Sequence, residues 1–199
     1  GEYSALVAAE VLTLSQAAPL VRLRAAAMQA AVPVGTGAMA AILGLDAAAV
    51  IAGCAQAQAT FEASSAEVVE AVNFNAPGQV VIAGGTDAVT KACELLKAAG
   101  AKRALPLPVS APFHSSLLQP ASEKLKGYLA DIEFKVPTIS VVNNVDVNVL
   151  NDPAAIKDAL VRQAAKPVRW QETINAMAQQ GITQVIECGL TVDRMQSHI

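Results

Sequence analysis

The chain has 199 residues, of which 53% are hydrophobic, 16% are charged and only 4% are aromatic. This composition is typical of a globular protein rich in small aliphatic residues, and it excludes the disordered and fibrous classes. The net charge of −3, with Lys and Arg scattered along the chain, argues against a nucleic-acid partner, and no apolar run reaches the roughly 18 residues that span a bilayer.

Two helices are predicted at the start of the chain. The first covers residues 2–12, where the apolar side chains that share one helical face are Tyr3, Leu6, Val7 and Val11. The second is expected to begin with Ser15 as its N-cap and to end near Val32, because Pro33 cannot continue it. The chain starts without Met inside a helical pattern, so we expect it to be part of a longer protein.

Residues 36–109 form a pattern of alternating strands and helices. Asp46 is expected to cap the first of these helices, Thr86 and Asp87 the second, and Gly100 to end the second. The predicted strands and helices, in chain order, are 38–43 (strand), 46–58 (helix), 67–74 and 79–83 (strands), 88–99 (helix) and 102–109 (strand). This β-α-β-β-α-β order is the ferredoxin-like arrangement.

The rest of the chain also alternates between the two kinds of element. Its predicted elements are helices over 116–129, 152–165 and 171–180 and apolar strands over 138–142 and 183–188. Strands that alternate with helices imply a parallel α/β sheet. We therefore predict an α/β fold in which residues 1–35 and 110–199 form the core and residues 36–109 are an inserted ferredoxin-like subdomain.

Arg24 is the most informative residue of the first half. A helical projection places it within an apolar arc, whereas Arg22 lies opposite and is expected to be solvated. The arc consists of Leu20, Leu23, Ala27, Met28 and Ala31. A guanidinium that points toward the protein requires an anion. That anion is either an internal carboxylate in a structural salt bridge or a substrate carboxylate, whose shape a guanidinium fork matches.

His114 lies between a predicted strand and a predicted helix. The carboxyl ends of strands are where open α/β sheets gather their ligands. A lone histidine in a loop is either structural or a general base. Pro112 and Phe113 favour the second interpretation because they would hold the loop in one shape, and His198, the penultimate residue, is not expected to act as the base.

The remaining reactive side chains show no pattern of a catalytic or metal site. The three cysteines, Cys54, Cys93 and Cys188, have no metal-ligand spacing and are expected to be small core residues in a reducing cytoplasm. Two histidines and no paired carboxylates argue against a zinc site, any other metal site, and glycosidase-like acid/base chemistry.

A series of short motifs runs through the chain in a fixed order. They are Gly1–Leu6, Arg22–Pro33, Thr36–Ala41, Asn73–Gln79, Phe113–Ser115, Val142–Val145, Leu160–Gln163 and Pro167–Trp170. Together they resemble the malonyl-CoA:acyl carrier protein transacylase family of fatty acid and polyketide synthesis. The resemblance extends to about Gly189, and the first motif looks like the end of the family's nucleophile elbow, G-H-S-L-G-E.

The resemblance implies an α/β-hydrolase-like core and transfer of a malonyl group from malonyl-CoA to the phosphopantetheine thiol of acyl carrier protein. The reaction passes through an acyl-serine and needs no bound cofactor. His114 matches the family's general base, and the backbone carbonyl of Gln163 matches the group that orients it. Arg24 matches the arginine that binds the malonyl carboxylate, and the residues that match the acyl pocket are Met28, Asn75 and Phe113.

Two departures from the family pattern stand at the ends of the chain. The nucleophilic serine and the oxyanion loop are expected upstream of Gly1, and Ser4 does not replace that serine because it lies beyond the elbow. Near the other end, the segment 187–191 departs from the family's E-x-G-P-G-x-x-L, and the tail 190–199 matches no family segment. The chain is therefore interpreted as a fragment that is inactive by itself.

Three functional interpretations stay open. The first is a cytoplasmic acyl-transfer enzyme of fatty acid biosynthesis. This enzyme is either free-standing or the acyltransferase domain of a polyketide synthase. The second is a non-catalytic module that docks acyl carrier protein. The third, a hydrolase on a related fold, leaves Arg24 without a role.

Overall fold

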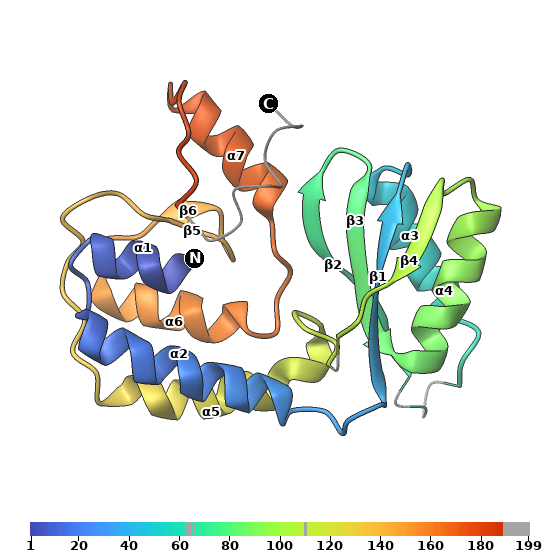
Figure 1. Cartoon of the computed structure of the whole chain (residues 1–199), viewed down its shortest axis with the longest axis horizontal. Helices are drawn as coiled ribbons and strands as arrows, with labels where there is room; N and C mark the ends of the chain where they lie inside the picture. The colour runs from blue at the N-terminus through green and yellow to red at the C-terminus, as the bar shows by residue number, and fades with distance from the viewer. Residues whose placement is uncertain (63–64, 66, 110, 189–199) are drawn as a thin grey trace.

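The computed structural model describes residues 1–62, 65, 67–109 and 111–188. Helices from both ends of the chain lie on one side of the molecule, and the middle of the chain forms a sheet with two helices on the other side (Figure 1). The tail 190–199, with His198, lies outside the described residues.

The middle of the chain forms a four-stranded antiparallel sheet in the order β2-β3-β1-β4. Its elements are β1 (Gly37–Leu43), α3 (Ala47–Gln58), β2 (Val69–Ala76), β3 (Gln79–Gly85), α4 (Thr86–Ala98) and β4 (Arg103–Pro106). All six predicted elements are therefore present, with ends that differ from the prediction by at most three residues. Helices α3 and α4 pack on one face, where the buried side chains include Ile42, Val50, Ile82 and Leu96.

Local chemistry explains several of these boundaries. The carboxylate of Asp46 accepts the Ala49 N–H at 2.7 Å, which confirms the predicted cap of α3. The cap of α4 differs from the prediction, because Gly85 is the N-cap and the carboxylate of Glu67 accepts the Ala88 N–H at 3.0 Å. That acceptor is 21 residues away in the sequence, so local pattern reasoning could not identify it.

The two ends of the chain form a layer of helices beside the sheet (Figure 1). The elements are α1 (Glu2–Ala8), α2 (Leu14–Gln29), η1 (Ser116–Leu118), α5 (Gln119–Ala130), the hairpin strands β5 (Val142–Asn143) and β6 (Asn148–Val149), α6 (Pro153–Gln163) and α7 (Trp170–Gln179). Their shared core contains Leu6, Leu20, Leu125, Leu129 and Leu160. No helix in the described ranges is long and apolar enough to cross a membrane.

The predicted N-cap of the second helix was wrong. Thr13 is the N-cap of α2, and its hydroxyl accepts the Gln16 N–H while the Gln16 side chain accepts the Thr13 N–H at 2.8 Å. This reciprocal capping box satisfies two backbone donors at once. Ser15 instead forms a hydroxyl–hydroxyl bond of 2.9 Å with Thr13.

The predicted strands 138–142 and 183–188 are not formed. Within the described residues, only Val142 of these two runs belongs to a strand, and 183–188 is irregular. An apolar, β-branched run becomes a strand only where a neighbour pairs with its backbone groups, and the described residues supply no such neighbour. Ile139 and Ile186 are accordingly 58% and 86% exposed.

A fold of mixed helices and strands is confirmed, but the predicted parallel sheet is not found among the described residues, where the four-stranded sheet is antiparallel. Parallel pairing in the described part of the chain is limited to one bridge between Asn73 and Val168. Cys54 is buried as predicted, but Cys188 is exposed and is not a core residue.

Candidate active site

The loop that carries His114 joins the sheet to the helical layer. Phe113 packs against the buried side chains of both parts. The Ser115 hydroxyl donates to the Pro112 carbonyl at 2.7 Å, and the Ser116 N–H donates to the Glu70 carboxylate at 2.7 Å. These contacts hold His114 at a φ of +64°, a conformation that non-glycine residues adopt infrequently and that is common at functional sites.

The imidazole of His114 faces the end of α6. Its Nδ1 lies 3.2 Å from the carbonyl oxygen of Gln163. A carbonyl oxygen only accepts hydrogen bonds, so Nδ1 carries the proton in the neutral ring and Nε2 is the basic nitrogen. The contact that the family resemblance implied between these two residues is therefore present in the structure.

The electrostatic surroundings keep His114 neutral. Burial lowers its pKa below the ordinary histidine value, and the positive charge of Arg24 lowers this pKa further. Hydrogen bonding to the carbonyl groups of Gln163 and Lys166 opposes these effects by stabilising the charged ring. A neutral imidazole with a free basic nitrogen can accept a proton at physiological pH.

Arg24 lies on α2 and is half-buried. Its guanidinium carbon is 5.9 Å from the centre of the Tyr3 ring, and among the described residues no carboxylate forms a salt bridge with it. Arg24 also affects the nearby carboxyl of Glu2, whose pKa is raised by burial and lowered in part by this positive charge. The internal salt bridge considered from the sequence is thus not found in the described residues.

The predicted helical arc around Arg24 was partly wrong. Leu23 is 42% exposed, whereas Leu20, Ala27 and Met28 are buried. Arg24 therefore lies at the edge of the buried face and not inside it. Arg22 is exposed, as predicted.

The other predicted pocket residues lie at different distances from this centre. Met28 is 4% exposed and belongs to the buried cluster that Phe113 packs against. Asn75 is half-buried on β2, and no hydrogen bond in the described part of the chain joins it to His114 or Arg24. The structure therefore groups Arg24, Met28, Phe113, His114 and Gln163, and leaves Asn75 without such a link.

Sequence reasoning assigned no role to Asn144. Its side-chain amide donates to the Gln163 side chain and, at 3.0 Å, to the Pro167 carbonyl. The signal was present in the motif Val142–Val145, since a second amide follows Asn143 in an otherwise apolar stretch. Asparagines at a strand end commonly satisfy turn backbones, so this pattern alone does not indicate a contact with α6.

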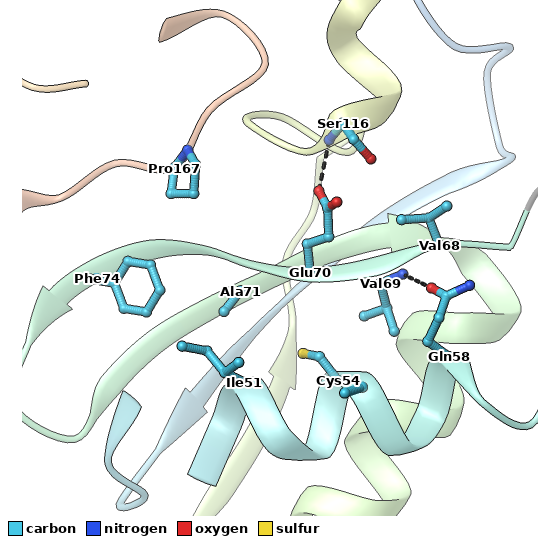
Figure 2. A pocket seen from close by; sticks show the side chains of 11 residues that line it. Ile51, Cys54, Gln58, Val68, Val69, Glu70, Ala71, Phe74, Ser116 and Pro167 are labelled. Carbon is cyan, nitrogen blue, oxygen red and sulfur yellow. Dashed lines mark hydrogen bonds between the residues drawn. The ribbon is translucent and has the colours of Figure 1, made fainter. Parts of the chain in front are cut away.

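A separate groove of 640 Å³ lies between α3 and β2. Figure 2 shows Ile51 and Cys54 on its helical side, Glu70 bonded to Ser116 on the opposite side, and Pro167 near Phe74. Neither Arg24 nor His114 lines this groove. It adjoins the His114 loop through Ser116 but is a different space.

Comparisons with known proteins match this chain to one family. Residues 1–190 match the model of the acyl transferase domain. The malonyl CoA-acyl carrier protein transacylase of Haemophilus influenzae is 55% identical over 189 residues, which are 95% of this chain and 59% of that protein. The chain thus spans about three-fifths of the length of this curated relative.

Solved structures agree. The acyl-carrier-protein S-malonyltransferase from Burkholderia pseudomallei is 66% identical with a TM-score of 0.90, covering 95% of this chain and 60% of that one. A type II PKS acyl-carrier protein in complex with its malonyl-transacylase contains a chain that is 51% identical with a TM-score of 0.86, covering 92% of this chain and 57% of that one. The chain therefore belongs to the acyl transferase domain family.

Proposed function

We propose that this chain supplies the general base and the carboxylate-binding arginine of a malonyl-CoA:acyl carrier protein transacylase in fatty acid biosynthesis. The observation that carries the proposal is the contact of 3.2 Å between His114 Nδ1 and the Gln163 carbonyl, with the charge of Arg24 acting on the same imidazole. A base held in one tautomer beside an arginine without a salt bridge suits a substrate that has both a thioester and a free carboxylate.

In this mechanism, His114 Nε2 removes the proton of a serine hydroxyl as the serine oxygen attacks the thioester carbonyl. The coenzyme A thiolate leaves and takes its proton from the His114 imidazolium, so that the imidazole is neutral again and a malonyl-serine ester remains. The phosphopantetheine thiol of acyl carrier protein then attacks this ester after His114 removes its proton, and the serine regains a proton from the imidazolium. In the family motif G-H-S-L-G-E, the serine stands two positions before the glycine that Gly1 matches.

Arg24 is proposed to select the acyl group. Its guanidinium would hold the free malonyl carboxylate through two parallel hydrogen bonds, an interaction that an acetyl group cannot form. Met28, Asn75 and Phe113 are proposed to line the acyl pocket. For Met28 and Phe113, their shared packing beside His114 supports this role.

We also propose that residues 36–109 are a ferredoxin-like subdomain inserted into an α/β-hydrolase-like core formed by 1–35 and 110–199. The antiparallel order β2-β3-β1-β4, with both helices on one face, supports the first part. The likeness to the Burkholderia pseudomallei structure, at a TM-score of 0.90, supports the second. A reducing, cytoplasmic location is proposed because the three cysteines are unpaired.

A second candidate is a role in polyketide synthesis, as an acyltransferase or as a docking module for acyl carrier protein. It is favoured by the likeness to the malonyl-transacylase that was solved in complex with a type II PKS acyl-carrier protein. Both candidates share acyl carrier protein as the partner. The docking module differs from both acyltransferases in that His114 takes part in no reaction.

The test is a fusion enzyme in which an N-terminal segment of the Haemophilus influenzae relative precedes Gly1. This segment ends at the residue that matches the leucine of the family motif G-H-S-L-G-E, so it includes the serine. Transfer of radiolabelled malonyl from malonyl-CoA to acyl carrier protein is measured with and without the substitution His114→Ala. Transfer that depends on His114 supports the enzyme. Binding of acyl carrier protein without transfer would support the docking module.

A further inference from the structure

The two carbonyl groups that face His114 belong to one turn. This turn covers residues 163–168, runs from the end of α6 toward α7 and includes the carbonyl groups of Gln163 and Lys166. At its far end the Val168 N–H donates to the Val72 carbonyl at 2.7 Å, and the Val168 carbonyl accepts the Phe74 N–H at 2.8 Å. The position of the imidazole therefore depends on what fixes this turn between the helical layer and the sheet.

Asn144 contacts this turn at both ends. Its side-chain amide donates to the Gln163 side chain and, at 3.0 Å, to the Pro167 carbonyl. Its side-chain oxygen accepts the Arg169 N–H at 2.8 Å. The Gln163 side chain in turn donates to the Lys166 carbonyl at 3.0 Å, so the same network reaches both groups that face His114.

The hairpin that contains Asn144 does not need this side chain. Asn143 closes the hairpin by itself, because its amide donates to the Asn148 carbonyl at 2.7 Å and its oxygen accepts the Asp146 N–H at 2.8 Å. A further ion pair of 2.7 Å joins Asp146 to Arg162 on α6. The hydrogen bonds of the Asn144 side chain thus go to the turn that contacts His114 and to Arg169, which follows the turn.

We propose that Asn144 is a positioning residue for His114, which acts by holding the 163–168 turn so that the Gln163 carbonyl keeps the proton on Nδ1. The catalytic meaning of this arrangement rests on the proposed function, but the arrangement itself is measurable without turnover. Replacing Asn144 by Ala removes three hydrogen bonds, two to the turn at Gln163 and Pro167 and one to the Arg169 N–H that follows it. The neutral imidazole is then expected to return to a mixture of its two tautomers.

The experiment is nitrogen NMR of the 199-residue chain labelled with ¹⁵N-histidine, at about pH 8, above the ordinary histidine pKa of about 6.5. The spectrum of His114→Gln identifies the His114 signals against those of His198. The ratio of Nδ1–H to Nε2–H forms in His114 is expected to fall about fivefold in Asn144→Ala, the factor that one neutral hydrogen bond contributes to an equilibrium. The matched control is Asp146→Asn, which loses the ion pair to Arg162 and none of the Asn144 contacts.

Each outcome decides the proposal. An unchanged tautomer ratio in folded Asn144→Ala, or an equal change in Asp146→Asn, would overturn the role of Asn144 and leave the proposed function intact. A wild-type His114 that is mainly Nε2–H would contradict both. If Asn144→Ala does not fold, the deciding variant is Asn144→Asp. This substitution keeps the size of the side chain and the Arg169 contact, but it turns an oxygen toward the oxygens of Gln163 and Pro167. The proposal then requires that the ratio of Nδ1–H to Nε2–H forms also falls in Asn144→Asp.

Discussion

The histidine and the arginine of this site act on each other through charge. The positive Arg24 lowers the pKa of His114, in the same direction as burial. A malonyl carboxylate bound to Arg24 would offset that positive charge and make the imidazole easier to protonate. In the proposed mechanism, substrate binding would thus make His114 a stronger base.

Arg24→Ala is expected to change acyl selectivity in the fusion enzyme. Malonyl transfer should fall by about two orders of magnitude or more, because a lost bidentate ion contact discriminates strongly between substrates, while acetyl transfer is retained or increased. The measurement is kcat/KM for malonyl-CoA and acetyl-CoA. Arg22→Ala is the matched control, since Arg22 is the exposed arginine of the same helix. An unchanged malonyl-to-acetyl ratio in Arg24→Ala would exclude the proposed carboxylate contact.

His114→Ala is expected to lower the acylation rate of the fusion enzyme by about two to four orders of magnitude. In the unsubstituted fusion enzyme, the rate should fall as pH drops through a pKa below the ordinary histidine value, because burial and Arg24 lower this pKa and only the neutral ring accepts the proton. Stopped-flow acylation at malonyl-CoA concentrations far below saturation, across the pH range, measures both effects, because this rate reports the pKa of the free enzyme, in which no malonyl carboxylate offsets Arg24. Near-normal acylation by His114→Ala, or a rate that falls already above the ordinary histidine pKa, would contradict the assignment.

At the scale of elements, the ends of the helices depend on specific acceptors. Helix α2 carries Arg24 and Met28 and begins with the capping box of Thr13 and Gln16. Helix α6 ends at Gln163, where its last carbonyl groups lack partners within the helix and are available to the imidazole. Helix ends thus both stabilise the fold and supply a group of the site.

Thr13→Ala is expected to reduce the free energy of unfolding by about 1 kcal/mol, the usual cost of a lost N-cap. Urea denaturation followed by circular dichroism measures this difference. Ser15→Ala is the control, because its hydroxyl makes only an exposed bond to Thr13, and its effect should be smaller. The reverse order of the two effects would show that Ser15 is the functional cap.

At the scale of the whole molecule, the described part of the chain holds the proposed base and the proposed carboxylate-binding arginine without an assigned nucleophile. Ser4 is exposed on α1, and the Ser115 hydroxyl is buried and donates to the Pro112 carbonyl. Neither residue is linked to His114 by a hydrogen bond within the described residues. A covalent acyl intermediate requires a nucleophile that contacts its base.

The 199-residue chain alone is therefore expected to form no malonyl adduct. The chain is incubated with radiolabelled malonyl-CoA and denatured, and its intact mass and retained label are measured, with the fusion enzyme as the positive control. A stoichiometric adduct on the chain alone would show that one of its own residues serves as the nucleophile.

The sequence alone determined that helices and strands are mixed, all six elements of residues 36–109 and the motifs that identify the family. Local signals set these features, namely alternation of apolar residues, the Asp46 cap and the glycines at turns. The same signals failed at 138–142 and 183–188, because strand formation depends on a neighbour that a local pattern does not contain.

Only the tertiary structure decided how the site residues meet. The Gln163 carbonyl is 49 residues from His114 in the sequence. The Glu70 carboxylate that accepts the Ser116 N–H is 46 residues from Ser116. The family resemblance implied the first contact. The second had no sequence signal, and the motif Val142–Val145 marked Asn144 without indicating its partners in the 163–168 turn. A backbone carbonyl is present at every residue, and only folding determines which one faces the imidazole.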